Sequence, residues 1–301
     1  MKSSVTFRHR LIYWLARTPI ANLLKISLRF RFLSALRARK KLADGLPSDT
    51  QLYSLVEEFQ RNGYCRLDDI VDPTILEEVA LAAVRKYDFA ERASNNQEAH
   101  RKDFWTRLLD EDKVDGTLPT DNPFVAFALQ PKILTFISKV CGEIPFLDDV
   151  LLVLSRHTGK KLSLSQLWHY DYDDTRTIKL YIYLSDVKNV DDGPFTFLPA
   201  PASKRLGRSL KSRRQDKEIF SRVDGSEVIR ILAPRLSVFI VETSRCLHMG
   251  SRVEEGHERL MYMASYITIP RLYPEPPPRF KLTGLESEIT RSVLTSAKHT
   301  V

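Results

Sequence analysis

Hydrophobic and polar positions follow a helical period in the first half of the chain. Apolar side chains recur at this spacing over residues 50–62, 72–89 and 123–141. Asp49 or Thr50 is suited to cap the first helix, and Asp72 precedes a proline at the start of the second. Gly63 is expected to end the first helix, and Pro131 to break the third segment. A short strand, YCRLDDIV, is predicted at residues 64–71.

From about residue 146 the pattern changes to short β-rich runs separated by Gly, Pro, Asp and Ser. Among them are DVLLVLSRH, TIKLYIYLSDV, LSVFIVE and RLMYMASYITI. Many short strands at this spacing predict a β-sandwich or barrel. Helices followed by strands predict one α+β domain in which helices buttress a sheet. Two regions interrupt this organisation: the polar residues 91–122, predicted as a long loop or lid, and a Pro-rich exit followed by a short helix.

The N-terminal segment is basic and amphipathic. Its apolar positions recur at roughly helical spacing, with Arg and Lys between them, at Ile20, Leu23, Leu24, Leu28, Phe32 and Leu36. Three interpretations remain open: a helix docked on the body by its apolar face, a helix lying on an anionic membrane surface, or an organelle transit peptide.

The charge is concentrated in this segment. Residues 1–43 hold 11 of the 46 Lys and Arg and none of the 38 Asp and Glu. The rest of the chain is nearly neutral, which argues against a nucleic-acid groove over the whole protein. No apolar run approaches the roughly 18 residues of a membrane span. Three cysteines without a CxxC pair indicate a reducing compartment, so we expect a cytoplasmic protein, with membrane contact through residues 1–43 as the open alternative.

Candidate chemistry begins in the stretch LWHYDYDD. His169 and Asp171 are two residues apart, so in a strand they share one face, where they can hold a metal ion or form a buried hydrogen-bonded pair. His248 follows 77 residues after Asp171, just beyond a later strand. Two histidines and one carboxylate form the facial triad of non-haem Fe(II) oxygenases, although the same ligand types also fit zinc.

Arg259 opens a strand 11 residues after His248, where a buried guanidinium can pair bidentately with a dicarboxylate co-substrate. Arg252, four residues after His248, is the competing candidate for binding this carboxylate. Lys179, near the start of the strand TIKLYIYL, is suited either to point a cation at the co-substrate or to be a solvated surface lysine.

The neighbours of this pattern are expected to be structural. Trp168 and Tyr170 alternate to the face opposite His169 and are predicted to pack in the core. Asp173 and Asp174 are predicted to be turn residues. Gln166 is suited to an internal hydrogen bond, and surface positions are expected for His157 and His257.

Taken together, these residues resemble the phytanoyl-CoA dioxygenase family of Fe(II)/2-oxoglutarate-dependent oxygenases. The resemblance covers about residues 50–270 and rests on SQLWHYD, TIKLYIYLSDV, DDGPFTFLPA and SRCLHMGS, with Arg259 at the family's offset; FQRNGYCRL is similar to the family's opening. It implies a double-stranded β-helix, a cupin-like jelly roll, buttressed by N-terminal helices. The implied organisation is an arm at residues 1–45, a dioxygenase domain at 46–272 with its β-core at about 146–270, and a Pro-rich tail at 273–301.

The resemblance also implies a site and a reaction. His169, Asp171 and His248 bind Fe(II), and Arg259 binds the C5 carboxylate of 2-oxoglutarate. Together with O2, the co-substrate is converted to succinate and CO2 while a second substrate is hydroxylated. Related halogenases lack the carboxylate ligand, so Asp171 favours hydroxylation.

The expected activity is therefore hydroxylation of a small-molecule or lipid-like substrate. Two alternatives remain: a non-catalytic β-helix that binds ligands, and a cupin-like metalloenzyme that uses another metal. Specificity is expected to depend on residues 91–122 and on the basic loop 203–224, which is suited to receive an anionic substrate or to be a solvated surface.

Overall fold

In this computed structural model the chain is described at residues 18, 20–47, 49–93, 103–207, 209, 211–273 and 277–296, without the side chains of residues 89–93. The part of the basic arm before residue 18 therefore lies outside the described residues. The helices are α2 (Ile20–Phe30), α3 (Leu33–Asp44), α4 (Thr50–Asn62), α5 (Pro73–Ala93), α6 (Pro123–Ala128), α7 (Pro131–Cys141), α8 (Ala200–Leu206), α9 (Asp216–Phe220) and α10 (Glu288–Leu294). Short 3-10 helices are η1 (Asp110–Asp112), η2 (Leu164–Gln166) and η3 (Gly225–Glu227).

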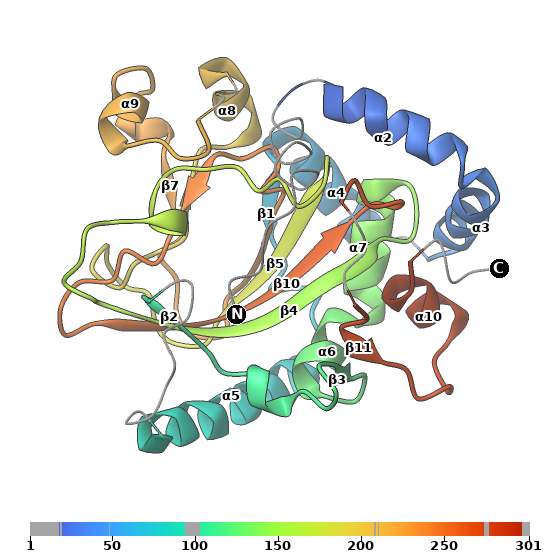
Figure 1. The fold of residues 1–301 in the computed structure, drawn as a ribbon, viewed down its shortest axis with the longest axis horizontal. Helices are drawn as coiled ribbons and strands as arrows, with labels where there is room; N and C mark the ends of the chain where they lie inside the picture. Colours follow the sequence, from blue (N-terminus) through green and yellow to red (C-terminus); the bar gives the residue numbers. More distant parts are fainter. Residues whose placement is uncertain are drawn as a thin grey trace.

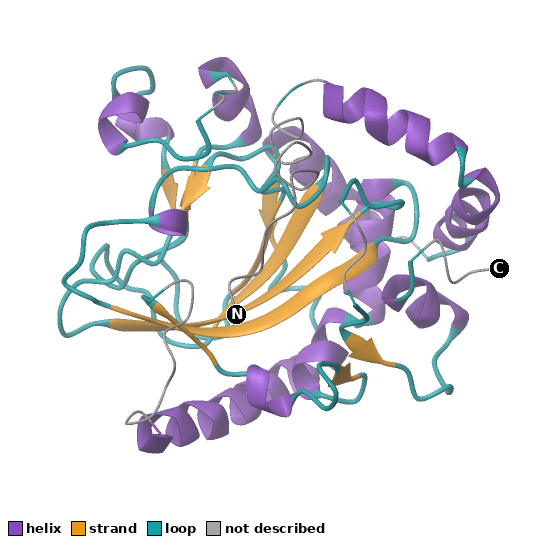
Figure 2. Cartoon of the chain, viewed as in Figure 1, coloured by secondary structure: helices purple, strands orange, loops and turns teal. Residues whose placement is uncertain are grey.

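The strands form three sheets (Figures 1 and 2). They are β1 (Tyr64–Arg66), β2 (Trp105–Arg107), β3 (Leu118–Pro119), β4 (Phe146–Arg156), β5 (Thr177–Tyr183), β6 (Thr196–Phe197), β7 (Ile229–Arg230), β8 (Val238–Val241), β9 (His248–Met249), β10 (Glu258–Ile267) and β11 (Phe280–Lys281). The major sheet has the order β1-β8-β5-β10-β4-β2 and the minor sheet β7-β6-β9, and both are antiparallel. A two-stranded parallel pair joins β11 to β3.

Local signals set the helix ends as predicted. The Asp49 carboxylate accepts a hydrogen bond from the Leu52 amide at 2.7 Å, and Gly63 ends α4 in the left-handed conformation. The Asp72 carboxylate accepts from the Thr74 amide at 2.9 Å and caps α5. The break at Pro131 separates α6 from α7, because proline has no amide hydrogen to continue a helix.

The major sheet is covered by helices on one face, and the larger core lies between them. Along β5, Ile178, Leu180 and Ile182 point into this core, as alternation in a strand requires. Helices α4, α5, α6 and α7 contribute the opposing apolar side chains, among them Phe59, Val79, Phe127 and Phe136. In Figure 2 these helices lie on one side of the large sheet.

The other face of the major sheet packs against the minor sheet. Tyr181 and Tyr183 of β5 point to this side, and their rings lie 4.8 Å from Phe195 and 5.1 Å from Phe239 respectively. One apolar cluster thus combines side chains from both sheets. The result is an α+β domain with two antiparallel sheets face to face, in agreement with the predicted class.

Residues 91–122 contain more regular structure than predicted. Helix α5 continues to Ala93, and β2, η1 and β3 follow before α6. The side chains of Phe104, Leu108, Leu109 and Leu118 are buried. The prediction of a long loop is wrong for residues 103–122, because polar composition hid apolar residues that the major sheet and helices bury.

The arm docks on the body, but not by the face expected. In α2, Ala21 and Lys25 are buried, whereas Ile20, Leu23 and Leu24 are exposed. The Lys25 ammonium lies 2.7 Å from the Asp174 carboxylate and donates to the Thr268 carbonyl at 2.9 Å. Docking by the apolar face is therefore wrong for α2, because a buried ion pair determines which side of the helix faces the protein.

Helix α3 is anchored through Arg39, which is 2% exposed. Its guanidinium donates to the carbonyls of Ile144 and Pro145 at 3.0 and 2.8 Å. Leu36 is buried beside it, as the arm's periodicity predicts. Within the described part of the chain, every helix falls short of the length and hydrophobicity needed to traverse a bilayer.

Candidate metal centre

His169, Asp171 and His248 meet in the space between the two sheets. The His169 Nε2 atom lies 3.8 Å from one oxygen of Asp171, and the His248 Nε2 atom lies 3.5 Å from the other. One candidate ligand atom from each residue falls within 4.8 Å of the others. The two imidazole side chains are 6% and 5% exposed, and the Asp171 side chain 14%. The predicted triad is thus brought together from segments 77 residues apart.

Backbone pairing holds the two histidines side by side. The amide of His169 donates to the carbonyl of His248 at 2.8 Å, and the reverse hydrogen bond measures 2.9 Å. This bridge continues the minor sheet, because His248 in β9 also pairs with Phe197 of β6. The amide of Asp171 donates to the Thr243 carbonyl at 3.1 Å, which fixes the third residue in the same layer.

The Nδ1 atoms orient both rings for ligation. His169 Nδ1 lies 2.8 Å from the Leu167 carbonyl, and His248 Nδ1 lies 3.0 Å from the Cys246 carbonyl. A carbonyl oxygen can only accept a hydrogen bond, so each Nδ1 carries the proton. Each Nε2 then presents a lone pair towards Asp171, as in metal-bound histidines, whose other ring nitrogen donates its proton to a carbonyl or carboxylate oxygen.

Burial and neighbouring charges favour the ligating protonation states. Burial, and then the neighbouring His248, hold the pKa of His169 well below its usual value; burial also lowers the pKa of His248. Burial is the largest single influence on Asp171 and opposes its ionisation, but the Lys179 ammonium, 2.7 Å from the carboxylate, together with His248 and His169 outweighs burial and holds the pKa of Asp171 well below normal. At neutral pH the set offers two neutral imidazoles and one carboxylate, the donor types that suit Fe(II).

Arg259 lies beside the triad. A cavity of about 60 Å³ is lined by His169, Asp171, His248, Lys179 and Arg259, together with Trp105, Tyr181, Phe195, Ser251, Met261 and Met263. Arg259 projects into it from β10 on the same face as Met261 and is 1% exposed. Within the described residues its guanidinium forms no ion pair, and its buried Nε has no hydrogen-bond partner. A buried cation without an anion is costly, so the cavity fits a carboxylate-bearing ligand.

Ser251 positions Arg259, a role that the sequence did not suggest. The Ser251 hydroxyl accepts from Arg259 Nη2 and from Trp105 Nε1, each at 2.7 Å. The other guanidinium nitrogen, Nη1, donates to the Gly193 carbonyl. Gly193 has φ +67°, and a Cβ there would lie 2.7 Å from Val253, so the turn requires glycine. The turn at Gly193 thus contributes to the site through its backbone.

The structure separates the two candidate arginines. Arg252 Nη1 and Nη2 both bind the Asp216 carboxylate, at 2.7 and 2.8 Å, and Nε donates to the Gln166 carbonyl. The charge of Arg252 is already neutralised, whereas no described residue neutralises that of Arg259. Arg259 is therefore the better receptor for a carboxylate.

The other residues singled out near the triad have structural roles, and the role predicted for Asp174 needs correction. Trp168 is buried and donates through Nε1 to Asp216 at 2.8 Å, and Gln166 donates to the Ser251 carbonyl at 3.0 Å. His157 is exposed, and His257 bonds Asp192. Asp174 is not simply a turn residue, because it is the buried partner of Lys25.

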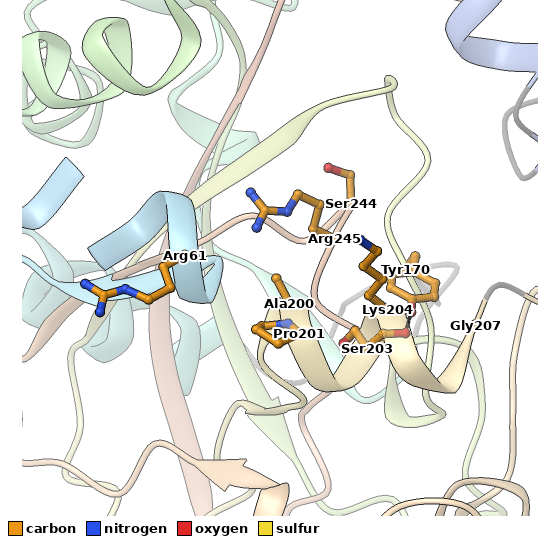
Figure 3. A pocket seen from close by; sticks show the side chains of 9 residues that line it. All are labelled: Arg61, Tyr170, Ala200, Pro201, Ser203, Lys204, Gly207, Ser244 and Arg245. Carbon is orange, nitrogen blue, oxygen red and sulfur yellow. Dashed lines mark hydrogen bonds between the residues drawn. The ribbon is translucent and has the colours of Figure 1, made fainter. Parts of the chain in front are cut away.

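A second cavity, of about 480 Å³, lies on the Tyr170 side of the metal-ligand segment (Figure 3). Tyr170 donates to the Ser203 carbonyl at its edge, and Arg61, Lys204 and Arg245 line it. It contains none of the triad residues and faces away from His169, since successive side chains in an extended segment alternate. The chemistry is therefore placed in the smaller cavity.

No protein-family model matches the sequence, and neither does any curated protein. Several solved structures share the fold. The epimerase SnoN, in complex with Fe3+, alpha ketoglutarate and nogalamycin RO, has a TM-score of 0.51 and 16% identity over 72% of this chain and 84% of that one. EctD from S. alaskensis, with 2-oxoglutarate and 5-hydroxyectoine, has a TM-score of 0.53 and 12% identity over 75% and 78%. AviO1 from Streptomyces viridochromogenes has a TM-score of 0.50 and 12% identity over 76% and 100%.

These similarities show the fold. SnoN is described as a non-haem, alpha ketoglutarate-dependent enzyme, and EctD was crystallised with 2-oxoglutarate. The present chain therefore has the fold of iron- and 2-oxoglutarate-dependent oxygenases. Whether it shares their chemistry depends on the residues of its own site.

Proposed function

We propose that this protein is an Fe(II)/2-oxoglutarate-dependent dioxygenase that hydroxylates a small-molecule or lipid-like substrate. One observation carries the proposal: a buried His-Asp-His set shares a cavity with a buried arginine that has no anionic partner among the described residues. A cupin-like hydrolase or isomerase that uses zinc or manganese and no 2-oxoglutarate would leave Arg259 without a role. The fold similarities support the proposal, and membership of the phytanoyl-CoA dioxygenase family is part of it.

The residues would divide the work as follows. His169, Asp171 and His248 would hold Fe(II), and Arg259 would bind the C5 carboxylate of 2-oxoglutarate. When bound, iron with 2-oxoglutarate and O2 supplies the oxidant: one oxygen atom enters the substrate C–H bond and the other enters succinate as CO2 leaves. The intact Asp171 supports hydroxylation. The paired sheets support the predicted jelly roll, with residues 46–272 as the catalytic domain.

The protein's own groups act by orientation and charge. The Leu167 and Cys246 carbonyls hold the Nε2 lone pairs towards the cavity. Ser251 and Gly193 fix the guanidinium of Arg259, so little conformational entropy is lost when a carboxylate binds. Lys179 keeps Asp171 ionised through their 2.7 Å contact and lies in the same cavity, where it would also face the co-substrate.

Succinate formation tests the proposal without a substrate, because uncoupled turnover of 2-oxoglutarate needs only the iron site. Protein is loaded anaerobically with Fe(II) and 2-oxoglutarate and then exposed to O2. We expect succinate from the wild type and from His157→Ala, whose histidine is exposed and outside the cavity, but none from His169→Ala.

Direct binding completes the test if uncoupled turnover is slow. Calorimetry with 2-oxoglutarate and Mn(II), which replaces iron without turnover, is expected to show one site per chain in the wild type. No binding of 2-oxoglutarate in the presence of either metal would refute the oxygenase assignment, and would favour a ligand-binding module or an enzyme that uses another metal.

A further inference from the structure

Helix α2 turns its apolar side away from the protein. Leu23, Ile26 and Phe30 follow each other at i, i+3 and i+7, and lie on one stripe of the helix. Leu23 and Phe30 are each 67% exposed and Ile26 is 52% exposed. The docked stripe, at Ala21, Lys25 and Leu28, lies on the opposite side because each residue turns the helix by about 100°. A soluble amphipathic helix normally has the reverse orientation.

Polar contacts on the buried side of α2 fix this orientation. Lys25 pairs with Asp174 and also donates to the Thr268 and Pro270 carbonyls, while the Arg29 guanidinium donates to Glu143 at 3.1 Å. Rotating α2 to bury its leucines would break this buried ion pair and leave the Asp174 carboxylate in the interior without its cation. The exposed apolar stripe is therefore a property of the docked helix.

Helix α3 extends the same surface. Leu33 is exposed at its start, and a groove of about 320 Å³ between the two helices is lined in part by Ile26, Phe30 and Leu33. In Figure 1 α2 and α3 lie at the periphery, outside the helices that cover the major sheet. We refer to Ile20, Leu23, Leu24, Ile26, Phe30 and Leu33 as the α2–α3 apolar surface.

Basic side chains accompany this surface. Arg31, Arg37 and Lys41 are exposed, and within the described residues none of them takes part in an ion pair. No Asp or Glu occurs between residues 1 and 43, and the sequence just before α2 adds Tyr13, Trp14 and further arginines. Exposed apolar and cationic groups, with Tyr and Trp just before them in the sequence, match the composition of helices that lie in the headgroup region of anionic bilayers.

We propose that the α2–α3 apolar surface docks this protein on an anionic lipid bilayer. The apolar side chains would enter the interface while Arg31, Arg37 and Lys41 contact lipid phosphates. A second copy of the chain is a poor occupant, because it would bring the same cations together. The proposal is independent of the oxygenase chemistry, although a membrane location would give a lipid-like substrate access to the enzyme.

Flotation with vesicles tests this proposal. The probes are phosphatidylcholine vesicles with and without about 30% phosphatidylglycerol. We expect the wild type to float with the anionic vesicles only, and about 0.5 M salt to weaken binding by screening.

Point variants assign the binding to this surface without disturbing the buried anchors. Replacing Leu23, Ile26 and Phe30 together by Ser is expected to lower the partition coefficient about tenfold or more, because three exposed apolar side chains are lost. Arg31→Gln, Arg37→Gln and Lys41→Gln combined should remove the preference for phosphatidylglycerol. The matched control replaces three exposed apolar residues elsewhere by Ser and should float like the wild type: Val114, Val190 and Leu285.

Three results would overturn the proposal. One is wild-type protein that stays at the bottom of the gradient with both kinds of vesicle. Another is a Leu23, Ile26, Phe30 variant that floats as well as the control. The third is a wild-type dimer in sedimentation velocity that the same variant dissociates, which would assign the surface to self-association. None of these readouts depends on succinate formation, so the oxygenase proposal stands or fails separately.

Discussion

At the scale of single residues, the site depends on which charges are already paired. Arg252 and Arg259 are both candidates for a carboxylate, yet Asp216 occupies both terminal nitrogens of Arg252. Among the described residues Arg259 has only neutral partners, which include the Gly193 carbonyl and the Ser251 hydroxyl. This buried guanidinium keeps its electrostatic attraction for a ligand, because no carboxylate in the described part of the chain pairs with it.

Substituting Arg259 by Lys should therefore weaken 2-oxoglutarate binding selectively. We expect the KM for 2-oxoglutarate to rise about tenfold or more, since charge-assisted bidentate hydrogen bonds contribute about 1.5–3 kcal/mol that a single ammonium does not reproduce. Steady-state succinate assays measure the effect, with Arg252→Lys as the matched control. Equal KM values for the two variants would contradict the assignment.

The three thiols provide a second test at this scale. Cys65 and Cys246 are buried and Cys141 is half-buried; burial raises the pKa of Cys141 to about 12 and raises those of the other two further. Only the thiolate is nucleophilic, so a raised pKa lowers the reactivity of the thiol at pH 8. The thiol then reacts only at more alkaline pH. We expect no rapid reaction with Ellman's reagent in the folded protein and three thiols after unfolding. A thiol that reacts within the mixing time would contradict this.

At the scale of elements, the arm and the metal-ligand segment are joined. Asp174, three residues after Asp171, is held by Lys25 of α2 and accepts from the Leu272 amide at 3.1 Å. Arg39 of α3 satisfies carbonyls that precede β4. The two helices of the arm are therefore part of the folded body through polar contacts, while their apolar residues remain largely outside.

Breaking the Lys25–Asp174 pair should destabilise the protein. We expect Lys25→Met to lower the free energy of unfolding by about 3 kcal/mol, because Asp174 would keep a buried charge without its cation. Urea unfolding measures the change. Lys40→Met is the control, since its pair with Asp44 is exposed and a surface substitution changes stability by about 0.5 kcal/mol or less. Equal midpoints for the two variants would show that the buried pair contributes nothing specific.

At the scale of the whole molecule, the metal centre joins the two sheets. Asp171 and His169 follow η2, His248 belongs to the minor sheet, and Arg259 belongs to the major sheet. A metal and a co-substrate bound there would connect the sheets through ligands that are distant in sequence. Binding to the native state alone shifts the unfolding equilibrium by mass action.

Metal and 2-oxoglutarate should therefore raise the melting temperature. At about 100 times the dissociation constant, the native state gains about 2.7 kcal/mol. We expect Mn(II) with 2-oxoglutarate to stabilise the wild type in differential scanning fluorimetry, and EDTA to reverse the shift. His169→Ala should show no such shift. A shift of the same size in this variant would place the metal elsewhere.

The sequence alone determined the features that depend on nearby residues. Caps at Asp49 and Asp72 and the break at Pro131 act over a few residues and were predicted correctly. The residue types of the candidate triad were also visible, because ligand chemistry restricts them to few side chains. The triad's juxtaposition was expected only through the resemblance to a family.

Tertiary structure decided what depends on contacts between distant segments. The role of Ser251 required Trp105 and Arg259 to meet at its hydroxyl, and the choice between Arg252 and Arg259 required the position of Asp216. The orientation of α2 was decided by Lys25, whose partner lies 149 residues away. Periodicity indicates that a helix has two faces, but the cost of an unpaired buried charge selects the face that docks.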